Sequence, residues 1–108
     1  MINYDGRRFR SVHDDGAPVA VYRQQDDLVW AEFAGGEIRR GSLTGTCDPQ
    51  GVLDFAYTMV LADGRIIAGH STNTPEHLPD GRIQLNEVWE RFGAHADKGV
   101  SAIAEVKD

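Results

Sequence analysis

The sequence contains a single cysteine, Cys47, among its 108 residues. One cysteine cannot form a disulfide within the chain, and it cannot by itself build a cysteine-based metal centre. Histidine is also sparse, and no two histidines have the H-x-H or H-x-x-x-H spacing of metal-binding pairs. The four histidines are His13, His70, His77 and His95. We therefore expect no disulfide and no metal site.

Long apolar runs and clusters of basic residues are missing as well. No run approaches the ~20 apolar residues of a membrane-spanning helix, and residues 1–8 contain no apolar core of a signal peptide. Lys and Arg number 11 against 17 Asp and Glu, which gives a net charge of −6. Nucleic acid and anionic membranes need a concentrated positive face. The sequence therefore predicts neither as a partner and favours a cytoplasmic protein.

Helical periodicity is absent too, and short β-type runs take its place. Apolar residues at i, i+3 and i+4 do not continue beyond one turn anywhere in the chain. Turn residues such as Asp63-Gly64 separate alternating runs, and an Asp-Gly pair there is a strong hairpin signal because both residues tolerate positive φ. The longest irregular link is expected at 74–81. The predicted strands are 7–12, 17–24, 28–34, 37–47, 52–61, 65–73, 82–92 and 100–106.

The order of these strands indicates a closed sheet. Because nearly every link is short, consecutive strands are expected to pair antiparallel. An open eight-stranded meander would expose two edges, and closure into a barrel removes them. Gly41 and Gly45, in one strand, fit closure because glycine permits sharp local coiling. The sequence thus predicts an all-β, eight-stranded antiparallel up-and-down barrel that forms a single domain over residues 1–108.

Period-2 alternation assigns the side chains that face the barrel interior. In the sixth strand we favour the set of Ile67, Gly69, Ser71 and Asn73 as inward. Several polar residues share the inward phase with the apolar ones. A barrel of ~8 strands either fills itself with side chains or holds one small ligand, and inward polar groups favour the ligand. The candidate ligand-binding residues are Phe33, Arg39, Tyr57, Ser71, Asn73, Glu87 and Trp89.

Glu87 is the carboxylate with the clearest functional potential, because it lies in phase with apolar neighbours in a strand. Burial would raise its pKa and suit it as a general acid or base, or as a ligand anchor. Alternatively, it forms a structural ion pair with an inward Arg39.

The other candidates also have two interpretations. The aromatic residues Phe33, Tyr57 and Trp89 either line a pocket, with the Tyr57 hydroxyl orienting a ligand, or form an ordinary core. Ser71 and Asn73 either supply hydrogen bonds at a cavity mouth or bond to nearby backbone. Trp30 and Val88 have the outward phase, which favours a homodimer through the outer barrel face.

Several segments of the chain resemble one known family. They are L-V-W-A-E-F-A-G-G-E-I at 28–38, G-S-L-T-G-T-C-D-P-Q-G at 41–51, D-F-A-Y-T at 54–58, A-D-G-R-I-I-A-G-H-S-T at 62–72 and G-R-I-Q-L-N-E-V-W-E-R at 81–91. Together they are similar to small uncharacterised bacterial proteins with avidin-like, calycin-type barrels, a fold also close to that of lipocalins. The resemblance covers nearly the whole chain. It implies an eight-stranded antiparallel barrel with a cavity, and it brings no known catalytic residue.

Some members of that family are called N-acetylglutamate synthase. An acetyl-CoA-dependent enzyme of that kind needs a Gly-rich turn at a helix start to bind the pyrophosphate. The sequence pairs no such turn with a helix, so we expect neither this activity nor a cofactor. The residues also contain no clear biotin-site motif, and biotin is not predicted as a ligand.

Three functions therefore stay open at this point. The first is a binding module that holds a small apolar or amphipathic molecule inside the barrel. The second is a cofactor-independent cyclase or isomerase of a biosynthetic pathway, which holds a flexible substrate in a folded shape while Glu87 or Tyr57 transfers protons. The third is a structural or assembly role with a packed core.

Overall fold

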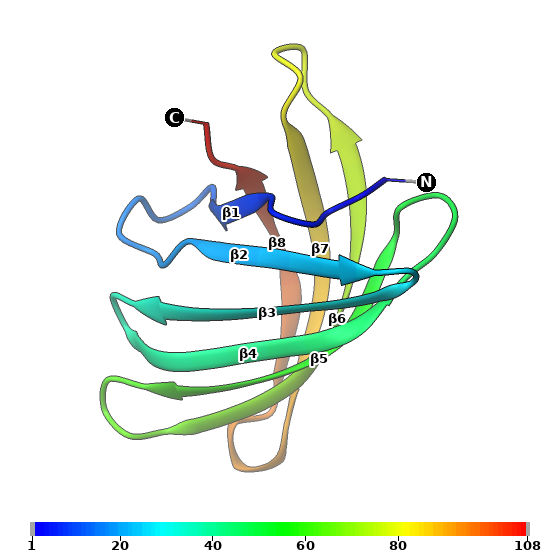
Figure 1. The fold of residues 1–108 in the computed structure, drawn as a ribbon. Coiled ribbons are helices and arrows are strands. Elements are labelled where there is room, and N and C mark those ends of the chain that lie inside the picture. Colours follow the sequence, from blue (N-terminus) through cyan, green and yellow to red (C-terminus); the bar gives the residue numbers. More distant parts are fainter. Residues whose placement is uncertain (1, 108) are drawn as a thin grey trace.

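The computed structural model describes residues 2–107, which form one closed barrel of eight antiparallel strands in sequential order (Figure 1). Within these residues the only helical element is the 3₁₀ turn η1 at Gly93–His95. The predicted all-β up-and-down barrel is therefore confirmed. The strands are β1 (Arg8–Ser11), β2 (Ala20–Gln25), β3 (Leu28–Gly35), β4 (Ile38–Cys47), β5 (Leu53–Leu61), β6 (Ile66–His77), β7 (Ile83–Phe92) and β8 (Asp97–Glu105).

The barrel closes between its first and last strands. Phe9 in β1 lies opposite Glu105 in β8, and the ladder continues to Ser11 and Ile103. The Arg7 guanidinium donates to the Glu105 carboxylate over 3.0 Å at the same junction. The closing ladder is short, because β1 pairs only with residues 103–105 of β8, while residues 97–101 of β8 pair with β7 alone.

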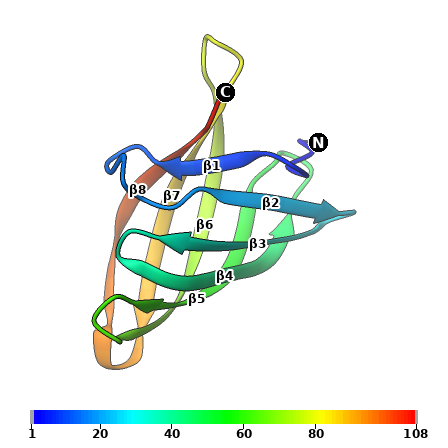
Figure 2. The same ribbon diagram turned by 60° about the vertical axis from the view of Figure 1, so that its left-hand side comes forward.

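Three predicted strand boundaries are wrong by three or more residues, the first being the start of β2, which begins at Ala20 rather than at residue 17. β6 continues to His77, where we expected an irregular link, because 74–77 pairs with β7 as far as Ile83. β5 starts at Leu53, which lies opposite Asn73, so Pro75 has only β7 as a neighbour, a position that a strand proline tolerates. The resulting β6–β7 hairpin extends beyond the neighbouring strands (Figure 2). β8 likewise begins at Asp97 rather than at residue 100.

One end of the barrel is filled by a hydrophobic cluster. Tyr4, which precedes the first strand, is fully buried there, and its hydroxyl donates to the Gly51 carbonyl over 2.6 Å. The cluster also includes Phe9, Tyr22, Val29, Leu53, Ile83 and Leu85. Every second link of an up-and-down barrel lies at the same end, so the links after β1, β3, β5 and β7 gather at the opposite end. The interior is therefore packed at one end.

The inward phases follow the predicted alternation with one exception. Ile67 and Asn73 are buried in β6 as predicted, together with the residues between them in that phase. Arg39 is exposed, so its predicted inward phase is wrong. The register of β4 against β5 shifts between Ile38 and Arg40, which leaves Arg39 as an extra residue on the bulged strand. Ile38 takes the inward position instead.

Two further observations concern residues 2–107 as a whole. No helix in this part of the chain is long and apolar enough to cross a bilayer. The same residues contain no group of three or more His, Cys, Asp or Glu side chains gathered as a metal ion would require.

Candidate functional site: the barrel cavity

A cavity of about 250 Å³ occupies the part of the barrel that the hydrophobic cluster does not fill. It extends toward the links after β1 and β7, because Pro18 of the first link and Arg91 near the end of β7 both line it. Its walls are mostly apolar and aromatic. Ligand cavities commonly combine such walls with a few placed polar groups, and one group of them here, Ser71, Glu87 and Ser101, comes from three adjacent strands, β6, β7 and β8.

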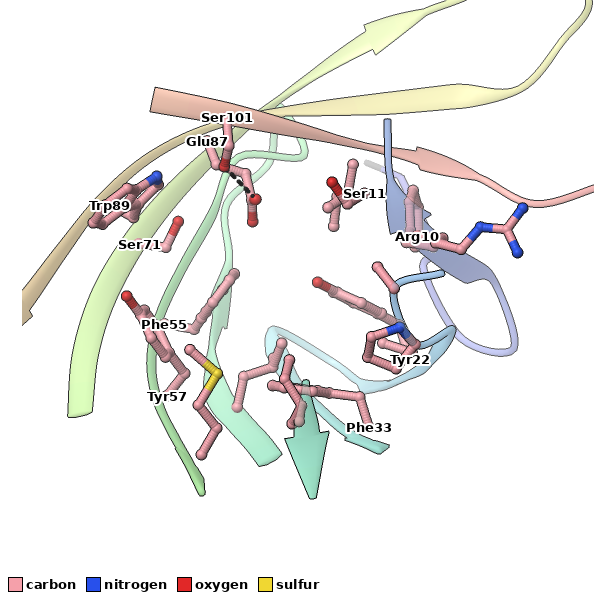
Figure 3. A pocket seen from close by; sticks show the side chains of 18 of the residues that line it. Arg10, Ser11, Tyr22, Phe33, Phe55, Tyr57, Ser71, Glu87, Trp89 and Ser101 are labelled. Carbon is pink, nitrogen blue, oxygen red and sulfur yellow. Dashed lines mark hydrogen bonds between the residues drawn. The ribbon is translucent and has the colours of Figure 1, made fainter. Parts of the chain in front are cut away.

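A chain of hydrogen bonds joins these polar groups. Ser71 Oγ donates to Asn73 Oδ1 over 2.5 Å, and Asn73 Nδ2 donates to Glu87 Oε2 over 2.8 Å. Ser101 Oγ donates to Glu87 Oε1 over 2.9 Å, and this bond crosses the top of the view in Figure 3. Each oxygen of the carboxyl group therefore accepts one hydrogen bond from a neighbouring strand. Glu87 is held in a single position by β6 and β8.

The environment of Glu87 favours its neutral form. Burial raises the pKa of the Glu87 carboxyl above its ordinary value, and the bonds from Asn73 and Ser101 oppose that rise. The ion pair with Arg39 does not form, because Arg39 is exposed on the outside of the barrel. The structural interpretation of Glu87 as half of a buried pair with Arg39 is thus wrong.

Aromatic rings form much of the cavity wall, and four of them lie directly opposite a glycine in the neighbouring strand. The opposed pairs are Phe33 and Gly41, Phe55 and Gly45, Tyr57 and Gly69, and Trp89 and Gly99. A Cβ atom on Gly41 would lie 2.2 Å from the Phe33 ring, and one on Gly99 would lie 2.7 Å from the Trp89 ring. The rings therefore use the space that a side chain would occupy, and this leaves the centre of the barrel open.

Two tyrosine hydroxyls add polar atoms to the cavity. The Tyr22 hydroxyl points into the cavity in Figure 3, although the rest of the residue belongs to the packed cluster. Burial raises the pKa of Tyr22, and the Glu87 carboxylate raises it further. Burial also raises the pKa of Tyr57, while the nearby Arg91 guanidinium opposes the rise. Both phenols therefore carry their protons at neutral pH and act as donors.

The structure brings most of the predicted site residues together. Phe33, Tyr57, Ser71, Glu87 and Trp89 line the cavity. Asn73 does not line the cavity. It is fully buried and donates a hydrogen bond to the Glu87 carboxyl group. The Ser71 side chain thus bonds to Asn73, and the Asn73 side chain bonds to Glu87, where nearby backbone was the alternative.

Most of the lining residues were not among the predicted candidates, and three of these carry polar groups that matter for the site. Arg91 shares the inward phase of Glu87 and Trp89, so alternation alone could have found it. Tyr22 lies in a strand where both phases carry apolar residues, which leaves the phase ambiguous. Ser101 lies in an Ala-rich strand, and only its register opposite Glu87 reveals its role.

The comparison with known proteins agrees with the fold. A family model described as avidin-like protein matches residues 2–106. No curated protein and no solved structure matches the chain. The matched span contains all eight strands of the barrel and every residue of the hydrogen-bond chain around Glu87. The chain therefore belongs to the avidin-like protein family.

Proposed function

We propose that this barrel binds a small, largely apolar molecule in its interior cavity. The observation that carries the proposal is the cavity of about 250 Å³, with aromatic walls and a hydrogen-bonded carboxyl group on its inner surface. A barrel with a purely structural role would fill this volume with side chains, since protein interiors pack about as densely as organic crystals. The volume is just below the ~300–1,000 Å³ of pockets for drug-sized ligands. A molecule with one ring fits that size.

The hydrogen-bond chain also indicates which hydrogen-bonding group of the ligand lies at the Glu87 end of the cavity. The Ser71 and Ser101 hydroxyl hydrogens are already donated, to Asn73 and Glu87 respectively. On Ser71, Ser101 and Glu87 the atoms that remain for a ligand include the lone pairs of the two hydroxyls and of the carboxyl group, and the Tyr22 hydroxyl also points into the cavity. The inner end of the ligand therefore carries an N–H or O–H donor.

A cavity-filling substitution tests this proposal. Met59 lines the cavity, and its neighbour Thr58 is exposed on the outer face of β5. Met59→Trp should abolish the binding of single-ring compounds detected by ligand-observed NMR, while Thr58→Trp should leave it unchanged. Circular dichroism confirms that both variants keep the β-fold. Equal binding to both variants would show that the compounds bind outside the cavity and would refute the proposal.

A second candidate function is a cofactor-independent cyclase or isomerase. It is favoured by one observation: the Glu87 carboxyl group, whose pKa is raised, and the Tyr57 hydroxyl line the same cavity. A raised carboxyl pKa suits a general acid near neutral pH. Glu87→Gln should then abolish turnover while changing ligand affinity only a few-fold. Recovery of every bound compound unchanged, with no deuterium incorporated from D₂O, would leave only the binding function.

We further propose that the protein is a cytoplasmic homodimer. Val88 and Val100 lie directly opposite each other in the β7–β8 ladder, and their exposed fractions are 63% and 78%. Adjacent exposed apolar side chains favour contact with another protein surface. Trp30, 36% exposed, lies on β3, on the far side of the barrel from β7 in strand order. The proposed interface is therefore the β7–β8 surface, and Trp30 is not part of it.

A further inference from the structure

Arg91 is a cation that the barrel places inside the cavity. Along β7 the inward side chains run from Glu87 through Trp89 to Arg91, toward the link that contains η1. The Arg91 guanidinium carbon lies 5.3 Å from the centre of the Trp89 ring. A guanidinium over an indole face is attracted by the ring quadrupole, so Trp89 helps to hold this side chain in place.

Arg91 is partly buried, and its guanidinium interacts with the Tyr57 hydroxyl while its buried Nε atom has no hydrogen-bond acceptor among residues 2–107. Asp97 lies directly opposite in β8, but Asp97 Oδ1 accepts from the Lys98 backbone N–H over 2.9 Å, and the two side chains form no ion pair in the described part of the chain. A buried N–H donor without an acceptor is costly. The Nε–H group of Arg91 can therefore donate to an acceptor that a ligand supplies.

The two charged groups give the cavity a direction. Glu87 and Arg91 are four residues apart in one strand, which corresponds to about 13 Å of backbone. The surface around Glu87 offers acceptors, and Arg91 offers donors and a positive charge. Arg10 also lines the cavity, but its guanidinium points away from it in Figure 3. Arg91 is thus the cation that faces the interior.

We propose that Arg91 binds a carboxylate group of the molecule held in the cavity. This inference rests on the proposed binding function and specifies its ligand: a single-ring molecule with a donor at the Glu87 end and a carboxylate at the Arg91 end. The planar guanidinium fork matches a carboxylate in shape and hydrogen-bond direction. One cation balances one negative charge. A doubly charged phosphate would have only this one cation to balance its two charges, with the Asp97 carboxylate directly opposite in β8.

A set of four matched compounds tests the inference. They are 4-hydroxyphenylacetate, phenylacetate and the primary amides of both, and their dissociation constants are measured by calorimetry at neutral pH. The wild-type protein should bind each acid roughly 10- to 100-fold more tightly than its amide, the range expected for a charge-assisted hydrogen bond. The hydroxyl should add affinity that Glu87→Gln reduces.

Variants of Arg91 give the decisive comparison. Arg91→Met keeps an unbranched side chain over Trp89 and removes the donors, so the preference for acids over amides should disappear. Arg91→Lys keeps the charge without the fork and should retain part of the preference. Arg39→Met removes an exposed arginine from the outside of the barrel and should leave the preference at its wild-type value. Circular dichroism shows that each variant is folded.

The possible failures are distinguishable. Equal binding of acids and amides to the wild-type protein, or a preference that survives Arg91→Met, overturns the role of Arg91 and leaves cavity binding intact. Binding that Met59→Trp does not reduce shows that the compounds do not enter the cavity, and both proposals fall. Absence of binding by all four compounds up to their solubility limits also contradicts both, since each fits the proposed ligand class in ring size.

Discussion

Asn73 donates a 2.8 Å hydrogen bond from Nδ2 to Oε2 of Glu87, so that a fully buried amide in β6 sets the position of a cavity carboxyl group in β7. Ser71 determines which way the amide points, because it donates to Asn73 Oδ1 and leaves Nδ2 facing Glu87. The cavity surface therefore depends on a residue that does not line it. Such buried polar chains are stable only when every member is satisfied.

Removal of the Asn73 side chain should destabilise the fold. Asn73→Ala leaves Glu87 without one donor and Ser71 without its acceptor, which should lower the free energy of unfolding by about 1–3 kcal/mol. Asn86 provides a matched control, because its bond to Glu76 is exposed and its loss should change stability by less than about 0.5 kcal/mol. Urea unfolding measures both. Similar effects for the two variants would contradict the structural role of Asn73.

Glu87 should make stability depend on pH in a defined direction. Its folded pKa is raised above the ordinary value of 4.5, so the folded state holds the proton more tightly than the unfolded chain. Stability from this group is present in full below the unfolded pKa and falls as pH rises through the folded pKa. The difference in unfolding free energy between wild type and Glu87→Gln, measured in urea from pH 4 upward, should shift in favour of the variant. Parallel curves would show that burial does not perturb Glu87.

The glycines opposite the aromatic rings should be sensitive to substitution, and to different degrees. A Cβ on Gly69 would lie 2.4 Å from the backbone oxygen of Glu90, whereas a Cβ on Gly99 meets the Trp89 ring at 2.7 Å. Backbone moves less readily than a side chain, so Gly69→Ala should cost more than Gly99→Ala, for which we expect about 1–3 kcal/mol. Thermal and urea unfolding give the comparison.

A second substitution tests the cause of the Gly99→Ala effect. If the clash is with the Trp89 ring, Trp89→Phe should recover part of the lost stability in the double variant, because the smaller ring leaves room for the methyl group. Strictly additive losses would instead place the clash in the backbone.

The proposed homodimer predicts a measurable mass. Light scattering at micromolar concentration should give twice the 11.9 kDa of one chain. Val100→Glu places a charge on the most exposed apolar side chain of the β7–β8 surface and should yield monomers. Trp30→Glu, on the far side of the barrel, should leave the mass unchanged. A wild-type mass near that of one chain would refute the dimer.

Much of this architecture follows from local sequence pattern alone. The eight runs, their order and their antiparallel pairing were predictable because alternation and turn residues act over a few neighbouring positions. The inward phases of Glu87 and Trp89 followed for the same reason, since no irregularity interrupts β7. Alternation within one strand therefore identified five of the residues that line the cavity: Phe33, Tyr57, Ser71, Glu87 and Trp89.

The tertiary structure decided what alternation cannot encode. Arg39 faces outward because a single extra residue in β4 is accommodated against β5, and the sequence of β4 does not show where that bulge lies. Ser101 meets Glu87 because the register of β8 places them opposite each other, and β6 extends to His77 because β7 continues to pair with it. Register and bulges are set by the energy of a whole ladder of cross-strand contacts, which forms only when distant strands come together. The sequence by itself determined which strands exist, and the closed barrel determined which side chains share the cavity.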